Sequence, residues 1–243
     1  MFLILALAVL PALILVYYTY QQDKLQREPV KNIVKAFFFG WLSVLASFFV
    51  SVPFGNMGLF PEEIHTLGDA FRMAFFGAAI PEESAKLLLL WLFLRKCRDF
   101  DERMDGIVYA VSVGMGFAAF ENIEYLIASG TDWVTTGIGR SLTAIPGHFA
   151  FAVIMGYYYS LNHFDSYRAP GAGIKMWLYP VLAHGLYDTI AMSAMVTPEL
   201  SGVFSVIILM GCFWALKWAR KQMSKHLLAD SQDSFHGLDE WKI

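Results

Sequence analysis

Long apolar runs alternate with short polar connectors along the chain. A helix needs about 20 apolar residues to cross the hydrocarbon core of a bilayer. The pattern therefore predicts transmembrane helices at residues 2–20, 33–52, 69–94, 106–128, 138–161, 176–196 and 202–219. The connectors are too short to separate two domains, and no internal repeat is visible. We expect an all-α polytopic bundle of about seven transmembrane helices in one domain, residues 1–219, followed by a polar tail, 220–243.

Basic residues gather in alternate connectors. One set of connectors holds Lys24, Arg27, Lys31, Lys35, Arg95, Lys96, Arg98, Arg103, Arg168 and Lys175. Lys217, at the end of the last predicted helix, and four residues of the tail add five more. The other set has only Arg72 and Arg140, both at the edges of predicted helices. Basic connectors stay on the cytoplasmic side of a membrane. The N-terminus is therefore expected outside the cell and the C-terminal tail in the cytoplasm.

The composition agrees with a membrane protein. Hydrophobic residues make up 57% of the chain and charged residues 16%, against about 45–50% and about 25% in soluble domains. These values argue against a soluble enzyme or a disordered protein, and two cysteines cannot build a disulfide scaffold. A net charge of −3 without a basic patch gives no support to a nucleic-acid partner.

Charged residues lie inside the predicted spans, where they are costly. Each Asp or Lys near the centre of a membrane helix costs about 2.5–3.5 kcal/mol. These side chains must therefore face one another or a polar cavity, and intramembrane ionisable groups indicate a functional site. The charged residues are Glu82, Glu83, Lys86, Glu121, Glu124 and Asp188, and two histidines, His148 and His184, accompany them.

The first cluster is Pro81-Glu82-Glu83-x-x-Lys86. On a helix Lys86 follows Glu82 by four positions and Glu83 by three, so it can pair with one carboxylate. The other carboxylate is then available to bind a metal or to activate water. Pro81 suits the start of a helix, where exposed N–H groups favour anions. The alternative is an ion pair that only packs the bundle.

The next span carries Glu121 and Glu124 three positions apart on one face. Glu121 lies deeper in the predicted span and is the candidate for a site. Glu124 lies nearer the outer boundary, where a solvated carboxylate is the simpler interpretation. Phe117, four positions before Glu121, would by itself be an ordinary core aromatic.

The histidines complete the set of candidates. His148 lies in an otherwise apolar run, and a lone histidine there is more often a satisfied core residue. His184 and Asp188 lie one helical turn apart. That spacing serves either chelation by both side chains or a carboxylate that orients the imidazole.

These residues, in this order, resemble the motifs of the PrsW family of membrane-embedded proteases. The motifs EExxK, FxxxE, a histidine in the next helix and HxxxD read here as Glu82-Glu83-x-x-Lys86, Phe117-x-x-x-Glu121, His148 and His184-x-x-x-Asp188. The match covers about residues 70–190. The related type II CAAX prenyl endopeptidases have EExxxR instead of EExxK and a histidine at the position of Glu121, which argues against prenylated substrates.

The resemblance implies a multi-pass endopeptidase of a prokaryotic cell membrane. Proteins of this kind make the first cut in a membrane-spanning anti-sigma factor, on its extracytoplasmic side. On this basis Glu82 is the expected general base or metal ligand, Glu83 is its alternate, and Lys86 neutralises whichever is not used. Asp188 is expected to orient His184. The expected ligands of a zinc ion are Glu82, Glu121, His148 and His184.

Three further interpretations remain open from the sequence. A metal-free mechanism would use Glu82 to activate water and a histidine to stabilise the oxyanion; we favour the metal. A proton- or ion-coupled transporter would use the same acids and histidines as a relay, although no inverted repeat supports it. A non-catalytic scaffold, in which the polar cluster only specifies packing, is the third reading.

Overall fold

The structure is a computed structural model that describes the backbone of residues 2–240 and the side chains of residues 2–233, and all regular structure in these ranges is helical. This confirms the all-α class. The α-helices are α1 (Phe2–Gln22), α2 (Val30–Asn56), α3 (Leu67–Arg72), α4 (Ile80–Leu94), α5 (Arg103–Ala128), α6 (Trp133–Leu142), α7 (Ala144–Phe164), α8 (Ala172–Val196) and α9 (Ser201–Glu240). A π-helix (Met73–Ala79) joins α3 to α4, and 3-10 turns (Gly130–Asp132, Pro198–Leu200) precede α6 and α9.

Five helical segments of the described chain are long and apolar enough to cross a membrane. They are Phe2–Gln22, Val30–Asn56, Arg103–Ala128, Gly130–Phe164 and Pro198–Asp233. The other two predicted spans correspond to the run from α3 to α4 and to α8. These two runs carry the paired glutamates and the HxxxD motif.

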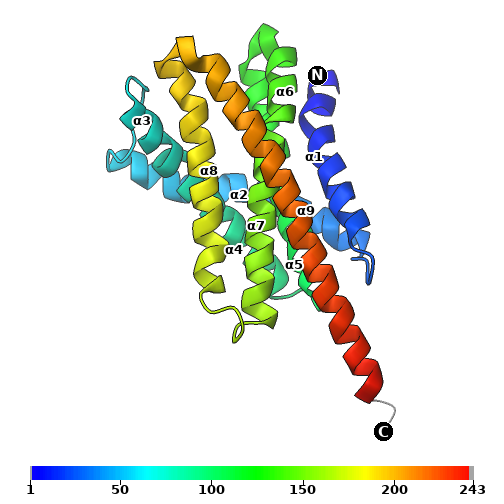
Figure 1. Cartoon of the computed structure of the whole chain (residues 1–243). Helices are drawn as coiled ribbons and strands as arrows, with labels where there is room; N and C mark the ends of the chain where they lie inside the picture. The colour runs from blue at the N-terminus through cyan, green and yellow to red at the C-terminus, as the bar shows by residue number, and fades with distance from the viewer. Residues whose placement is uncertain (1, 241–243) are drawn as a thin grey trace.

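The centre of the bundle is α5, which is buried without interruption from Met104 to Ala119. It packs against α1, α2 and α7 (Figure 1). Close approach of α2 and α5 depends on two glycines, because a Cβ at Gly40 or Gly116 would collide with the backbone of the facing helix. This packing fixes the position of the polar end of α5.

The run predicted over 69–94 as one transmembrane helix is helical throughout, with the π-helix as its irregular part. Pro81 has no N–H, and its ring would meet the carbonyl of Gly77 in a regular α-helix. The backbone widens instead, so that the N–H of Ile80 bonds the carbonyl of Phe75 five residues back. The ring of Phe75 packs where a Cβ of Gly185 would lie. This close contact brings α8 against the π-helix that precedes α4.

Three connectors with basic residues lie together at one end of the bundle. Gln26, between α1 and α2, bonds Asp101, between α4 and α5, at 3.2 Å. Arg103 pairs with Asp165, between α7 and α8, at 2.5 Å. The N-terminus lies at the opposite end, and α9 projects past the bundle at the connector end (Figure 1). The tail predicted from residue 220 continues α9 to Glu240 without a break; 241–243 lie outside the described residues.

Candidate active site

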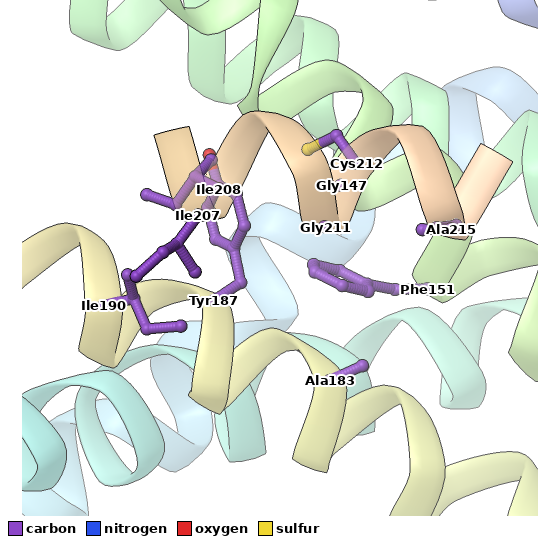
Figure 2. Close-up of a pocket in the computed structure, with 11 residues that line it drawn as sticks. Gly147, Phe151, Ala183, Tyr187, Ile190, Ile207, Ile208, Gly211, Cys212 and Ala215 are labelled. Carbon is purple, nitrogen blue, oxygen red and sulfur yellow. The ribbon is translucent and has the colours of Figure 1, made fainter. Parts of the chain in front are cut away.

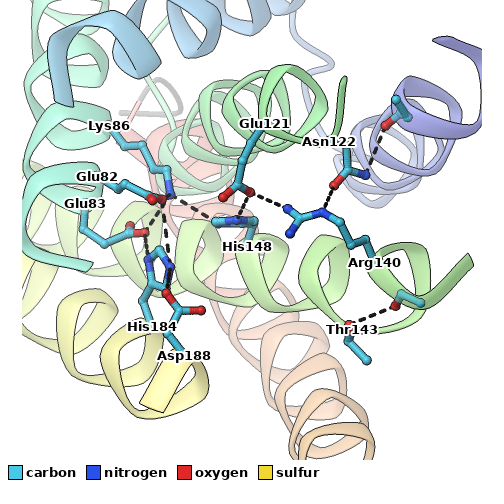
Figure 3. A network of polar contacts seen from close by, with 12 residues as sticks. Glu82, Glu83, Lys86, Glu121, Asn122, Arg140, Thr143, His148, His184 and Asp188 are labelled. Atoms are coloured by element: carbon cyan, nitrogen blue, oxygen red, sulfur yellow. Dashed lines mark hydrogen bonds and ion pairs between the residues drawn. The ribbon is translucent and has the colours of Figure 1, made fainter. Parts of the chain in front are cut away.

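The structure brings together all seven site residues that the sequence predicts. They are Glu82, Glu83 and Lys86 on α4, Glu121 on α5, His148 on α7, and His184 and Asp188 on α8. Their side chains form one continuous network of hydrogen bonds and ion pairs (Figure 3). Each of the four helices therefore supplies the residues of its own motif to this network.

Lys86 lies at the centre of this network. Its Nζ atom is 2.8 Å from Glu83 Oε1 and 3.3 Å from Glu82 Oε2, so it pairs with both carboxylates, whereas the spacing alone suggested one. It also lies 3.2 Å from His148 Nδ1. The ring of Phe117 faces the ammonium at 3.9 Å, which gives the first residue of the FxxxE motif a contact with the charge.

His184 is held by carboxylates on both ring nitrogens. Its Nδ1 lies 2.8 Å from Glu83 Oε1, and its Nε2 lies 3.2 Å from Asp188 Oδ2. The ring stacks on Phe151, with the centroids 5.0 Å apart and the planes at 17°. Hydrogen bonds and stacking together leave the imidazole a single orientation.

Glu121 lies on the other side of His148. Its Oε2 atom is 3.0 Å from His148 Nε2 and accepts a hydrogen bond from Arg140 Nη2 at 2.6 Å. The sequence indicated Arg140 only as a basic residue at a helix edge. A signal did exist, because Arg140 is one of two basic residues on its predicted side. Glu124 is exposed and lies outside the network, as expected for a solvated acid.

Four of these residues have the geometry of a metal site. Ligand atoms of Glu82, Glu83, His148 and His184 all lie within 4.8 Å of one another. Carboxylate oxygens and imidazole nitrogens form a donor set that zinc accepts, and Glu83 Oε2 is buried without a hydrogen-bond partner. Glu121, which the sequence suggested as a ligand, does not belong to this group.

The residues fit a metal ion, provided that Lys86 moves. Its ammonium now lies against Glu82, Glu83 and His148, three members of the metal-capable group. The ammonium of Lys86 therefore occupies the position in the network where a cation is stabilised, and a metal ion would take that position.

A polar cavity of about 270 Å³ opens onto the network. Glu82 and His184 line it, whereas Glu83 does not. A second cavity, of about 240 Å³, lies between α7, α8 and α9 and is lined almost wholly by apolar side chains (Figure 2). Tyr187 borders both cavities. Carboxylate and imidazole groups of the network line the first cavity and not the second.

Comparisons with known proteins agree with this site. The model of a family described as PrsW family intramembrane metalloprotease matches residues 28–216. Protease PrsW of Geobacillus kaustophilus (strain HTA426) is 32% identical over 215 residues, which are 88% of this chain and 89% of the relative. Protease PrsW of Bacillus subtilis (strain 168) is 30% identical over 231 residues, 94% of this chain and 99% of the relative.

A third relative, protease PrsW of Clostridioides difficile (strain 630), is 32% identical over 190 residues, 76% of this chain and 78% of the relative. No solved structure matches the chain. The matched region contains every element that supplies the polar network. The chain therefore belongs to the PrsW family of intramembrane metalloproteases.

Proposed function

We propose that Glu83, His148 and His184 bind the catalytic metal ion, with zinc as the ion, and that Glu82 is the general base. The observation that carries this proposal is the convergence of these four side chains, three of them buried, beside one polar cavity. Three protein ligands with an open position are typical of catalytic zinc. Glu82 lines the cavity and Glu83 is fully buried, which supports this division between the two glutamates.

The chain's own residues then divide the work. When bound, the metal ion lowers the pKa of a coordinated water and polarises the scissile carbonyl. Glu82 takes the proton from the water and delivers it to the leaving amine. Asp188 accepts a hydrogen bond from His184 Nε2 and so directs Nδ1 toward Glu83. Lys86, whose Nζ lies 3.3 Å from Glu82 Oε2, supplies the positive charge that balances Glu82.

The substrate is a protein with a membrane-spanning segment, of the anti-sigma-factor kind that the family resemblance implies. The N-terminus lies outside a prokaryotic cell membrane and the C-terminus in the cytoplasm. The connectors rich in Lys and Arg support this orientation, because contacts such as that of Gln26 with Asp101 hold them at one end of the bundle. Glu121 lies near the opposite end of α5, which supports cleavage on the outer side.

The test compares metal content and cleavage in the purified full-length protein after mild chelation and addition of zinc. The wild type is expected to retain about one zinc ion per chain and to cut a co-reconstituted single-span substrate. His184→Ala should lose both the zinc and the cleavage. Glu82→Gln should keep the zinc and lose only the cleavage, because it removes the base and leaves the ligands.

Two outcomes would contradict the proposal. A folded wild type that cuts its substrate without bound metal would favour the metal-free glutamate mechanism. Loss of zinc from Glu82→Gln together with retention by Glu83→Gln would exchange the roles of the two glutamates. Circular dichroism and thermal unfolding of each variant show whether the helical fold is retained.

A further inference from the structure

Arg140 is a largely buried cation on the short helix α6, with 16% of its side chain exposed. It donates from Nη2 to Glu121 Oε2 and from Nε to Asn122 Oδ1, both at 2.6 Å. The ring of Tyr125 faces its guanidinium at 3.8 Å. A buried guanidinium is stable only when it is paired in this way. Arg140 thus holds two successive residues of α5 in fixed positions (Figure 3).

The contact with Glu121 extends to His148. The same oxygen, Glu121 Oε2, lies 3.0 Å from His148 Nε2. A carboxylate only accepts hydrogen bonds, so Nε2 carries the proton. On the other side of the ring, Nδ1 lies 3.2 Å from Lys86 Nζ, and an ammonium only donates. Two independent contacts therefore select the same tautomer, with the Nδ1 lone pair on the side of Glu82 and Glu83.

We propose that Arg140 is a positioning residue of the protease site. By holding Glu121 against Nε2, it keeps the proton of His148 on that atom and presents Nδ1 as the metal ligand. This inference rests on the proposed role of His148 as a ligand. Ligating histidines in other metal sites likewise donate their second N–H to an acceptor, and loss of that acceptor weakens metal binding about 10–100-fold.

Glu121 alone does not secure this arrangement. The cations that act on its carboxylate are Arg140 and Lys86. Without Arg140, the carboxylate is drawn toward Lys86 and away from Nε2. The direct hydrogen bond from Arg140 Nη2 to Glu121 Oε2, at 2.6 Å, opposes that rotation.

A purely structural role for Arg140 makes a different prediction. Asn122 Nδ2 donates to the carbonyl of Ala8 at 3.3 Å, so Arg140 also takes part in joining α6, α5 and α1. Asn122→Ala removes that link and leaves the pair of Arg140 with Glu121 in place. It is therefore the matched control for substitutions of Arg140.

The experiment measures the tautomer of His148 by NMR spectroscopy and the affinity of the protein for zinc by titration. The full-length protein, labelled with 15N-histidine and free of metal, is compared as wild type, Arg140→Met, Arg140→Lys and Asn122→Ala, with His148→Gln to assign the resonance. We expect a single Nε2–H tautomer in the wild type and in Asn122→Ala. Arg140→Met should show a mixture of tautomers, and Arg140→Lys, which keeps one donor, an intermediate state.

Zinc titration gives the second measurement. Arg140→Met should raise the Kd about 10–100-fold, Arg140→Lys less, and Asn122→Ala by no more than about twofold, although Asn122→Ala should lower Tm. An unchanged tautomer and Kd in both Arg140 variants would overturn the inference, as would equal changes in Asn122→Ala. A wild type that binds no zinc would instead contradict the proposed function, and the tautomers in the metal-free protein would still decide the role of Arg140.

Discussion

Buried charge occurs in two parts of the bundle. One is the polar network around Lys86. The other is an acidic cluster near the start of α5, formed by Asp23, Glu28, Glu102, Asp105 and Asp230. Burial is nearly the same in both, because Glu83, Asp23 and Asp105 are each 0% exposed. Burial of charge alone therefore does not distinguish a catalytic site.

The two clusters differ in the groups that their carboxylates contact. Asp105 accepts hydrogen bonds from the backbone N–H groups of Asp101 and Glu102 at 2.9 and 2.6 Å. Asp230 accepts from those of Arg103 and Met104, both at 3.0 Å. These acids cap the first turn of α5, where N–H groups lack helical partners.

The carboxylates of the Lys86 network contact imidazoles and an ammonium instead, beside a cavity. Within the described side chains, a metal-capable group is found in this network and not in the acidic cluster. Carboxylates and imidazoles that gather beside a cavity indicate a catalytic site, whereas carboxylates that accept from backbone N–H groups indicate helix capping. This comparison predicts how the two clusters respond to substitution.

The largest expected difference is in catalysis. His184→Ala should reduce cleavage of a single-span substrate by at least about 10²-fold, because it removes a proposed ligand of the metal ion. Asp230→Asn should leave cleavage within about twofold, because it weakens a cap of α5 and an ion pair with Arg103, both away from the Lys86 network. The measurement is the initial rate in proteoliposomes at equal protein content. Equal losses in the two variants would remove the distinction between the clusters.

The next difference concerns the cation of each cluster. Lys86→Met removes the ammonium that pairs with Glu82 and Glu83, and breaking a buried ion pair costs about 3–5 kcal/mol. Added zinc should restore most of the lost Tm, since a metal ion supplies the missing positive charge. Arg103→Met also destabilises the protein, because it breaks contacts with Asp165 and Asp230.

Zinc should not restore Arg103→Met. Thermal unfolding with and without zinc gives the comparison. Lys86→Met that stays destabilised at saturating zinc would show that the ammonium does not lie where the metal binds.

The sequence predicts which residues form the site better than it predicts the contacts between them. The cost of charge in a membrane singled out Glu82, His184 and the other site residues, because few physical reasons other than function place such groups there. Helical periodicity gives the face on which a side chain lies, but not the rotation of one helix against the next. The contact of Arg140 with Glu121 and the pairing of Lys86 with two carboxylates depend on that rotation.

The pattern of apolar and polar residues also did not predict two local features, the π-helix before Pro81 and the length of α9. The π-helix before Pro81 depends on the carbonyl that its ring would meet, together with the packing of Phe75 on Gly185. A proline predicts an interruption, yet it does not state whether the chain kinks, breaks or widens. Continuation of α9 to Glu240 has a tertiary cause as well, because Asp230 on that segment caps α5.

The smallest expected effect is a pH dependence that belongs to the acidic cluster. Burial raises the pKa of Glu28 and of Glu102 to about 7, and that of Asp23 to about 6. Each raised pKa means that the folded protein binds more protons than the unfolded chain in this range. The stabilisation is complete below about pH 4 and is lost as the pH rises through 6 to 7. Stability should therefore be greater at pH 5 than at pH 8.

Glu28→Gln tests this dependence with little change in shape. Burial favours the neutral form of Glu28, as does the charge of Asp23 and Asp99, whereas hydrogen bonds from Tyr109 and Asp105 oppose it. Glutamine is neutral at every pH and its carbonyl still accepts the bond from Tyr109. The variant should gain about 1 kcal/mol at pH 8 after allowance for solvent screening, and little at pH 5. Chemical unfolding at both values measures it, with exposed Glu62→Gln as the control; an equal gain at pH 5 and pH 8 would show that the charge of Glu28 is not its source.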